Sequence, residues 1–541
     1  MWNPYKIPTR KYSQNLQHHL TDRESGYKRR HIRSTPCSDY LYFEREFHKS
    51  ILPNLTIQNV DRPLGFIRKF SPNGKLLLSF SNDKRSLEVW KYAGVGHAAE
   101  LFKNEQGECI TAADQSLESL RIRQEVFKRL FTLRSRIHFG SSVTHTYGQL
   151  NREFSIFLEN GRYVLLAAVT SSHDELPFRI IFTYPDIYPD CSLCNYTFFL
   201  VDLEKDCVVD TLLYNKDHIM LSHHHGVSVY NHTIAILSKL RQCIEVVELV
   251  NGKLVRLQTI GPFANDMDEA RVPIPDCVYM GALPLTHLKQ RILAHIYTNI
   301  FKIESAHLRK RKLLEFYKFF QTYEDMVILK MQLLDVDHLL IRYEKRPRNV
   351  NVQDFKLYVF YCISKCAVMR VFSRSSIELL YLLRNFCDNF RNVRSLQSLD
   401  SSSSSSNNAY YRAAFNNAIA SVNGGVAEAA MRFNPTLPIS SQSFSTAQYL
   451  DYNLFCYDDQ LISALERPKL CSREPIRFTD RNTNITKFRL FLETSVDLRP
   501  NHQLVTFIFH PFEPFIISVQ KLYTRYVTNF HIYNQSTIVT Q

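Results

Sequence analysis

The sequence lacks any apolar run of the roughly 18 to 20 residues that a membrane-spanning helix needs. Residues 1–27 also lack the apolar stretch that follows the charges of a secretion signal. We therefore expect a soluble intracellular protein without membrane contact. The motifs Gly-x-Gly-x-x-Gly, Gly-x-x-x-x-Gly-Lys-Ser/Thr, Gly-x-Ser-x-Gly and His-Glu-x-x-His are missing. Nucleotide-dependent and common hydrolytic enzymes use these motifs, so we expect no catalytic residue, no cofactor and no enzymatic activity.

Cysteine is present without a pattern that predicts disulfide bonds. The 12 cysteines are irregularly spaced, and most lie in apolar stretches, where a reduced thiol behaves as a small hydrophobic group. Cys191 and Cys194 have the spacing of a zinc-ligand pair, and three histidines follow at 223–225. A structural zinc site normally needs a second spaced pair. The pattern therefore favours a hydrogen-bonded turn at the histidines over a metal site.

The charge balance is basic, because 66 Lys and Arg stand against 52 Asp and Glu and give a net charge of +14. Such an excess suits contact with nucleic acid or other acidic partners and a nuclear setting. Three clusters could be nuclear-import patches, although solvated loop or helix charge is the simpler interpretation. The clusters are Lys28, Arg29, Arg30 and Arg33; Arg309, Lys310, Arg311 and Lys312; and Lys345, Arg346 and Arg348.

One strand-turn-strand phrase occurs near both ends of the chain. The first copy is Phe70-Ser-Pro-Asn-Gly74, the second is Phe509-His-Pro-Phe-Glu513, and each precedes an apolar run; a looser third copy has Asn160-Gly161 at its turn. Asn-Gly favours tight turns, and the apolar runs suit buried strands. Repetition of four-stranded units around a ring buries both faces of each unit and lets the first and last units pair. We therefore predict a mainly β fold, a β-propeller.

The patterns divide the chain into an N-terminal segment and a ring. Residues 1–45 are polar and basic, whereas 46–541 are predicted to form a single propeller of about seven blades. A β pattern dominates to about residue 300, and helical patterns interrupt it near 302–323 and 375–433. These helices are predicted to be insertions packed on or beside the ring.

Two further segments of the ring have other patterns. Residues 395–408 include the serine run 401–406 and have little to bury, so we expect a disordered loop. Residues 113–139 combine charges with a Leu and Phe pattern that fits a long helix and a pair of strands equally well.

Several short blocks match, in order, those of one known family. They are Phe66-Ile-Arg-Lys-Phe-Ser-Pro-Asn-Gly74, Lys330-Met-Gln-Leu-Leu-Asp335, Asn385-Phe-Cys-Asp-Asn-Phe-Arg391, Leu437-Pro-Ile-Ser-Ser-Gln-Ser-Phe444, Glu466-Arg-Pro-Lys469, Pro475-Ile-Arg-Phe478 and Phe509-His-Pro-Phe-Glu-Pro-Phe515. Through these blocks the chain resembles the De-etiolated-one family, whose insect branch is called Abnormal oocyte. The resemblance runs from about residue 46 to residue 533. Tryptophan occurs only at Trp2 and Trp90 and no Trp-Asp repeat is present, so the WD40-like blades must be irregular.

The resemblance implies a non-catalytic, substrate-recruiting scaffold subunit of a nuclear cullin-4-type E3 ubiquitin ligase. The implied partners are the large damaged-DNA-binding adaptor, its small associated subunit, a ubiquitin-conjugating enzyme or its variant, and a RING-type ligase partner. The resemblance also implies negative regulation of transcription at chromatin, including histone genes. The alternative is a chromatin-associated repressor that contacts histones or DNA directly.

A short helix is predicted in the N-terminal segment. Ser13 is a plausible N-cap, and Leu16 and Leu20 lie four apart on one face. A short isolated amphipathic helix is marginal in water and becomes stable by docking. The family's N-terminal helix is similar to the helical boxes by which receptors insert into the adaptor. The resemblance implies that Leu16 and Leu20 are the apolar anchors, with His19 and Arg23 at the rim.

Overall fold

The structure is a computed structural model, described from residue 47 to residue 534 with gaps. The gaps are 64, 106, 140–147, 176–191, 262–286, 325, 346–354, 392–412, 414, 440–446, 452–453, 459, 463–467, 472–473, 482, 494–502 and 523–524. The N-terminal segment and the serine-rich segment 395–408 therefore lie outside the described residues.

Four sheets each contain four antiparallel strands that follow one another in chain order. Consecutive strands pair because short turns, such as Asn251-Gly252 between β13 and β14, reverse the chain between apolar runs. The sheets are β2 (Gly65–Phe70), β3 (Leu76–Ser81), β4 (Ser86–Tyr92) and β6 (Phe131–His138); β7 (Gln149–Leu158), β8 (Tyr163–Glu175), β9 (Ser192–Asp202) and β10 (Cys207–Asp217); β11 (Val227–Tyr230), β12 (Thr233–Ser238), β13 (Cys243–Val250) and β14 (Lys253–Ile260); and β15 (Met326–Leu333), β16 (His338–Lys345), β17 (Lys356–Cys362) and β18 (Ala367–Ser373).

The other strands form a three-stranded and a six-stranded sheet. In the six-stranded sheet, β1 from the start of the described chain pairs antiparallel with β25 from its end, and Leu55 faces Ile532. The pairing of the first and last units predicted from the repeated phrase is thus confirmed. The strands are β19 (Phe455–Cys456), β21 (Ile476–Asp480) and β22 (Thr486–Leu490) in the first sheet, and β20 (Lys469–Cys471), β23 (Gln503–Phe509), β24 (Ile516–Leu522), β25 (Arg525–Ile532), β1 (Leu55–Ile57) and β5 (Cys109–Ile110) in the second.

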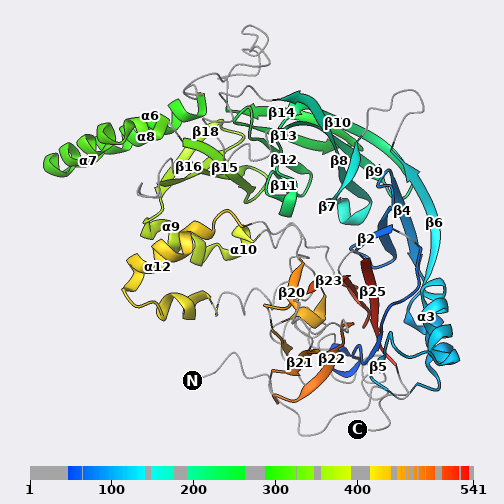
Figure 1. The fold of residues 1–541 in the computed structure, drawn as a ribbon. Coiled ribbons are helices and arrows are strands. Elements are labelled where there is room, and N and C mark those ends of the chain that lie inside the picture. Colours follow the sequence, from blue (N-terminus) through cyan, green and yellow to red (C-terminus); the bar gives the residue numbers. More distant parts are fainter. Residues whose placement is uncertain are drawn as a thin grey trace, which may run out of the picture.

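Figure 1 shows the sheets following one another around an arc. The hydrophobic core lies between neighbouring sheets, since Leu78 of β3 and Val164 of β8 belong to one buried cluster, and Val246 of β13 and Ile341 of β16 to another. The fold is mainly β, a propeller with irregular blades, as the sequence predicted. Its described residues form six sheets, where about seven blades were expected.

In the described part of the chain, α-helices occur in both predicted insertions and also within the segment 113–139. The segment 113–139, for which the sequence fitted two interpretations, contains helix α3 followed directly by strand β6. Within the described residues, no helix is both long and apolar enough to cross a membrane. The helices are α3 (Leu117–Leu130), α6 (His287–Phe301), α7 (Ala306–Lys318), α8 (Phe320–Glu324), α9 (Ile377–Asn385), α10 (Cys387–Phe390) and α12 (Gly425–Phe433), and the short 3-10 helices are η2 (Val95–Phe102), η3 (Glu159–Gly161), η4 (Ser222–His224), η6 (Asn434–Thr436) and η7 (Gln448–Leu450).

The two ends of the chain meet through the repeated phrase itself. His510 of the second copy accepts backbone N–H bonds at Nδ1 from Phe512 and Glu513, at 3.1 and 2.8 Å. Its proton is therefore on Nε2, which donates to the Gly74 carbonyl of the first copy at 3.0 Å. Gly74 has a φ of +71°, and a Cβ there would lie 2.5 Å from the His510 ring. Glycine is thus required where the two copies touch.

Candidate partner-binding site on the helical projection

The sequence-predicted site residues fall in two parts of the chain. Leu16, His19, Leu20 and Arg23, together with Lys28, Arg29 and Arg30, lie outside the described residues. Arg309, Lys310, Arg311 and Lys312 lie on α7. The roles predicted for the first group stay predictions, and the second group belongs to the surface described next.

We call helices α6, α7 and α8 together the helical projection; they stand between β14 and β15 in the chain. Leu288 and Ile292, in the first part of α6, are buried in the cluster that lies between the β11–β14 sheet and the β15–β18 sheet. Figure 1 shows α7 reaching away from the sheets. The helical projection is therefore anchored to a blade at its root and held out from the ring at its far end.

A small core of its own stabilises the helical projection. Leu293 and Ile300 of α6 are buried with Phe316 of α7. The Phe316 ring also contacts the rings of Tyr297 and Tyr323, each with a centroid distance of 5.8 Å. Because this core holds α6 against α7, the remaining apolar side chains are presented in a fixed arrangement.

The helical projection exposes several large apolar side chains. Leu314 and Tyr317 are 64% and 58% exposed. Exposed aromatic and aliphatic side chains are typical of protein-protein contact sites. The other exposed members are Tyr297, Phe301, Leu308 and Phe320.

Cations lie on the same helix as Leu308, Leu314 and Tyr317. Arg309 to Lys312 are consecutive on α7, so their side chains point around most of the helix circumference. Lys312 Nζ pairs with Glu315 Oε2 at 2.8 Å, and Arg309 Nη1 donates to the Ile303 carbonyl at 3.5 Å. The helical projection thus combines exposed apolar side chains with basic ones, which suits a partner that carries acidic groups.

Two of the six exposed apolar side chains, Tyr297 and Phe301, were not predicted to belong to the insertion, because the predicted insertion begins at 302, whereas α6 begins at His287. The β pattern assigned as far as residue 300 is wrong for 287–300. The signal was available, since Leu288, Ile292, Ile296 and Ile300 recur every four residues, a helical spacing.

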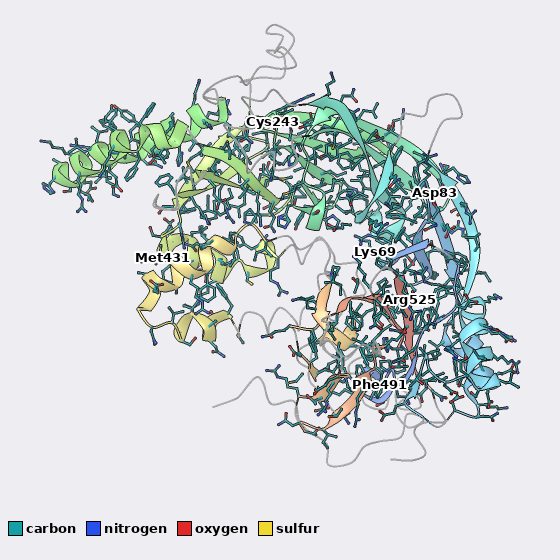
Figure 2. All side chains as sticks on the ribbon, viewed as in Figure 1. Lys69, Asp83, Cys243, Met431, Phe491 and Arg525 are labelled. Atoms are coloured by element: carbon teal, nitrogen blue, oxygen red, sulfur yellow. The ribbon has the colours of Figure 1, made fainter. Side chains whose placement is uncertain are left out.

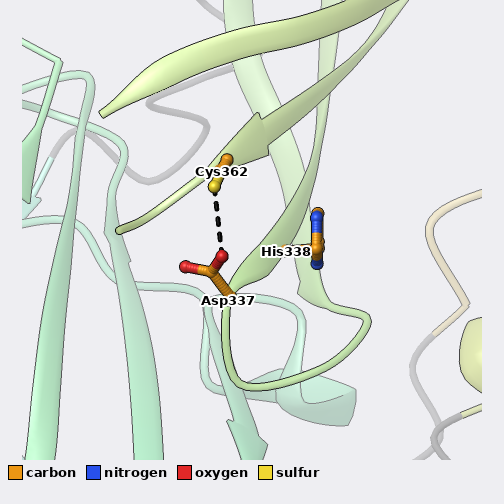
Figure 3. A group of neighbouring side chains, drawn as sticks. All are labelled: Asp337, His338 and Cys362. Carbon is orange, nitrogen blue, oxygen red and sulfur yellow. Dashed lines mark hydrogen bonds between the residues drawn. The ribbon is translucent and has the colours of Figure 1, made fainter. Parts of the chain in front are cut away.

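A second group of side chains has the chemistry of metal ligands. Ligand atoms of Asp337, His338 and Cys362 lie within 4.8 Å of one another. Figure 3 shows Cys362 and Asp337 facing each other with His338 to one side. Asp337 accepts hydrogen bonds from the Cys362 thiol at 3.1 Å and from the Ser364 N–H at 2.7 Å, while His338 Nδ1 lies 2.9 Å from the Asp335 carboxylate. Hydrogen bonds that join the ends of β16 and β17 account for this group, and we assign no metal to it.

The histidines at 223–225 form a turn, the interpretation that the sequence favoured. The backbone N–H of His224 donates to the Leu221 carbonyl at 3.0 Å. The His224 side chain is buried, and its ring lies 5.2 Å from that of Phe154. Cys191 lies outside the described residues.

The chain is similar to proteins of one family along most of its length. The model of the family described as De-etiolated protein 1 Det1 matches residues 152–534. The Light-mediated development protein DET1 of Solanum lycopersicum is 28% identical over 512 residues, which cover 89% of this chain and 92% of that protein. The protein of the same name from Arabidopsis thaliana is 26% identical over 535 residues, which cover 91% and 95%.

Solved structures are far more distant. The Dos1 propeller is 7% identical, with a TM-score of 0.25 over 89% of this chain and 95% of that one. The C-terminal WD40 domain of Sif2 is 5% identical, with a TM-score of 0.21 over 88% and 97%. Scores this low add nothing to the description of the fold given above.

Proposed function

Because the chain belongs to the De-etiolated protein 1 (Det1) family, we propose that this DET1-type regulator is a non-catalytic scaffold that recruits substrates to a nuclear cullin-4-type E3 ubiquitin ligase. Its partners would be the large damaged-DNA-binding adaptor, the small subunit associated with it, a ubiquitin-conjugating enzyme or its variant, and a RING-type ligase partner. These partners would carry out the chemistry, and the assembly would repress transcription.

The observation that carries the proposal is the helical projection. A scaffold needs a rigid body and an exposed surface that a partner can cover. The anchored root of α6, the buried Phe316 core and the exposed side chains of Leu314 and Tyr317 supply both. We assign the conjugating enzyme to this surface, and we assign the adaptor to the N-terminal helix at 13–23.

The adaptor contact is tested by affinity purification from nuclear extract. We expect the intact chain to recover the adaptor and the cullin, identified by mass spectrometry. A Leu16→Ala/Leu20→Ala variant should lose both, because truncation removes the two apolar anchors of the docking helix. Equal recovery of the adaptor by the variant and the intact chain would overturn this contact.

The partner contact of the helical projection is tested with a Leu314→Ala/Tyr317→Ala variant in the same purification. We expect recovery of the conjugating enzyme to fall roughly ten-fold or more, since truncation of buried interface anchors costs about 2 kcal/mol or more. Adaptor recovery should not change. Both side chains are exposed, so the ring should stay folded. The matched control is Leu133→Ala/Leu470→Ala, which truncates two exposed leucines on strands β6 and β20. A similar loss of the conjugating enzyme with this control would contradict its assignment to the helical projection.

The net charge of +14 supports a second candidate function. In it, the chain is a chromatin-associated transcriptional repressor, for example of histone genes, that contacts histones or DNA directly. The same purification separates the two functions. Recovery of histones or DNA without any ligase subunit, in amounts that fall steeply with added salt, would favour direct contact, because neutralised phosphates release counterions.

A further inference from the structure

A pocket of about 580 Å³ lies where the β2–β6 sheet meets the six-stranded sheet. The connection between β1 and β2, helix α3 and the start of β25 contribute its lining. Figure 2 labels Arg525, which stands at the start of β25. The volume falls in the range of about 300–1,000 Å³ that is usual for small-ligand sites.

Two arginines of the pocket are held in place by neutral oxygen atoms. Arg62 donates from Nε to Thr528 Oγ1 at 2.7 Å and from Nη1 to the Gly65 carbonyl at 2.8 Å. Arg123 donates from Nη1 to the Ala112 carbonyl at 2.9 Å, and it also bonds other carbonyls of that loop and helix. These bonds fix the orientation of both guanidinium groups without neutralising their charge.

Neither of these two arginines forms an ion pair within the described part of the chain. The Arg123 side chain is only 6% exposed. Burial lowers the pKa of Arg62 to about 10, although Glu88 raises it in part. The carboxylates of Asp114 and Glu493 act on Arg123 without forming an ion pair with it. A buried cation whose charge is only partly compensated costs free energy, and a bound anion would recover part of that cost.

The charged side chains that line the pocket are mostly positive. Glu493 pairs with Arg525 at 2.8 Å, and Glu88 pairs with Arg136 at 2.7 Å. Asp61 also lines the pocket, and it is exposed. Among the lining residues themselves, Arg62, Arg123 and Arg525 stand against Asp61 alone. The carboxylates that act on Arg62 and Arg123 from outside the lining are Glu88, Glu493 and Asp114. The lining therefore favours an anionic group.

Aromatic and amide side chains complete the lining. The rings of Phe66 and Tyr526 meet edge to face with a centroid distance of 6.0 Å. Outside the pocket lining, the Arg152 guanidinium lies 3.7 Å from the Phe66 ring centroid and adds a further cation at this rim. The amides, which can both donate and accept hydrogen bonds, are Asn59, Asn82 and Gln124.

We propose that this pocket binds a short acidic peptide segment of a partner protein. A side-chain carboxylate of the segment pairs with Arg62 and Arg123, and an apolar side chain covers Phe66 and Tyr526. The amide side chains bond the peptide backbone. A compact phosphate would use the arginines but leave the aromatic part of the lining uncovered, which is why the geometry favours a peptide. The proposal does not depend on the ligase role, because binding is measured with the isolated chain.

The test uses purified full-length protein and a fluorescein-labelled hexapeptide, Asp-Glu-Asp-Leu-Glu-Asp, followed by fluorescence anisotropy. We expect saturable binding that weakens with added salt. The unlabelled peptide should displace the probe, whereas its Asn and Gln counterpart should not. Absence of saturable binding would overturn the proposal. Displacement by inorganic phosphate as effective as displacement by the peptide would also overturn it, and would make the pocket a phosphate site.

Two variants and a control connect binding to the pocket. Arg525→Gln should weaken binding about ten-fold, because it leaves Glu493 unpaired next to Arg123. Tyr526→Ser should weaken it by roughly three- to ten-fold through loss of the ring surface. Both side chains are exposed, and circular dichroism verifies their folding. The control is Arg489→Gln, which removes one positive charge at an exposed position of β22. If this control weakened peptide binding as much as Arg525→Gln, the proposal would be contradicted.

Discussion

Replacement of Phe515 by alanine is expected to lower the free energy of unfolding by about 3–5 kcal/mol. The side chain is fully buried where the two ends of the chain meet. It stacks on Tyr92 at a centroid distance of 5.5 Å, and it lies 5.9, 5.9 and 5.2 Å from the rings of Phe70, Phe131 and Phe530. The neighbours come from four different strands, so they cannot all move in to fill the cavity. Urea denaturation followed by circular dichroism measures the change.

The control for this prediction is Phe512→Ala, in the same turn. The Phe512 side chain is 38% exposed, so its removal should cost less than about 1 kcal/mol. Equal destabilisation by the two substitutions would show that the turn itself, rather than the aromatic cluster at the chain ends, determines the stability there.

Acidification from pH 7 to pH 5 is expected to remove about 4 kcal/mol of stability through two buried histidines. Burial lowers the pKa of His531 to about 3 and that of His48 to about 4, against an ordinary value of about 6.5. Below pH 6.5, therefore, both histidines bind a proton in the unfolded chain but remain neutral in the folded chain. Each histidine then costs about 1.4 kcal/mol per pH unit, or about 2 kcal/mol at pH 5.

His531 places its share of the acid sensitivity at the pairing of β1 with β25, where Thr56 faces His531. Its ring nitrogens lie 2.9 Å from Thr56 Oγ1 of β1 and 2.9 Å from Ser518 Oγ of β24. Both partners are neutral hydroxyls, and no carboxylate among the described residues compensates a positive charge on the imidazole.

Urea midpoints measured at pH 7, 6 and 5 test the prediction. A His531→Gln variant should be less stable at pH 7 but should lose about 2 kcal/mol less than the unchanged chain on acidification to pH 5. His307→Gln, at an exposed position of α7, should behave like the unchanged chain. A His531→Gln variant with the full acid sensitivity would show that other groups cause it.

Much of the fold could be predicted from short stretches of sequence. The phrase that begins at Phe70 and its copy that ends at Phe515 predicted two hairpins, and both are present as β2–β3 and β23–β24. The Asn251-Gly252 pair forms the turn between β13 and β14 in the same way. These predictions succeeded because turn chemistry and apolar runs act over a few residues, which the sequence displays directly.

Other parts could not be predicted in this way. The segment 113–139 fits both a helix and a strand because Phe127, Leu130 and Phe131 are buried in the same cluster on either side of the boundary between α3 and β6. Apolar residues close together in the sequence do not tell which of the two structures brings them into a core. The candidate site was found only in part, since α7 was predicted and α6 was not.

The sequence by itself determined the class of fold, the hairpins at both ends of the chain, the helix α7 and the family. Only the tertiary structure decided that Gly74 touches His510, that His531 is enclosed between β1 and β24, and that Arg62, Arg123 and Tyr526 line one pocket. The physical reason is distance along the chain. Turn and helix signals are local, whereas the burial and charge of a side chain depend on neighbours that lie hundreds of residues away and arrive only when the ring closes.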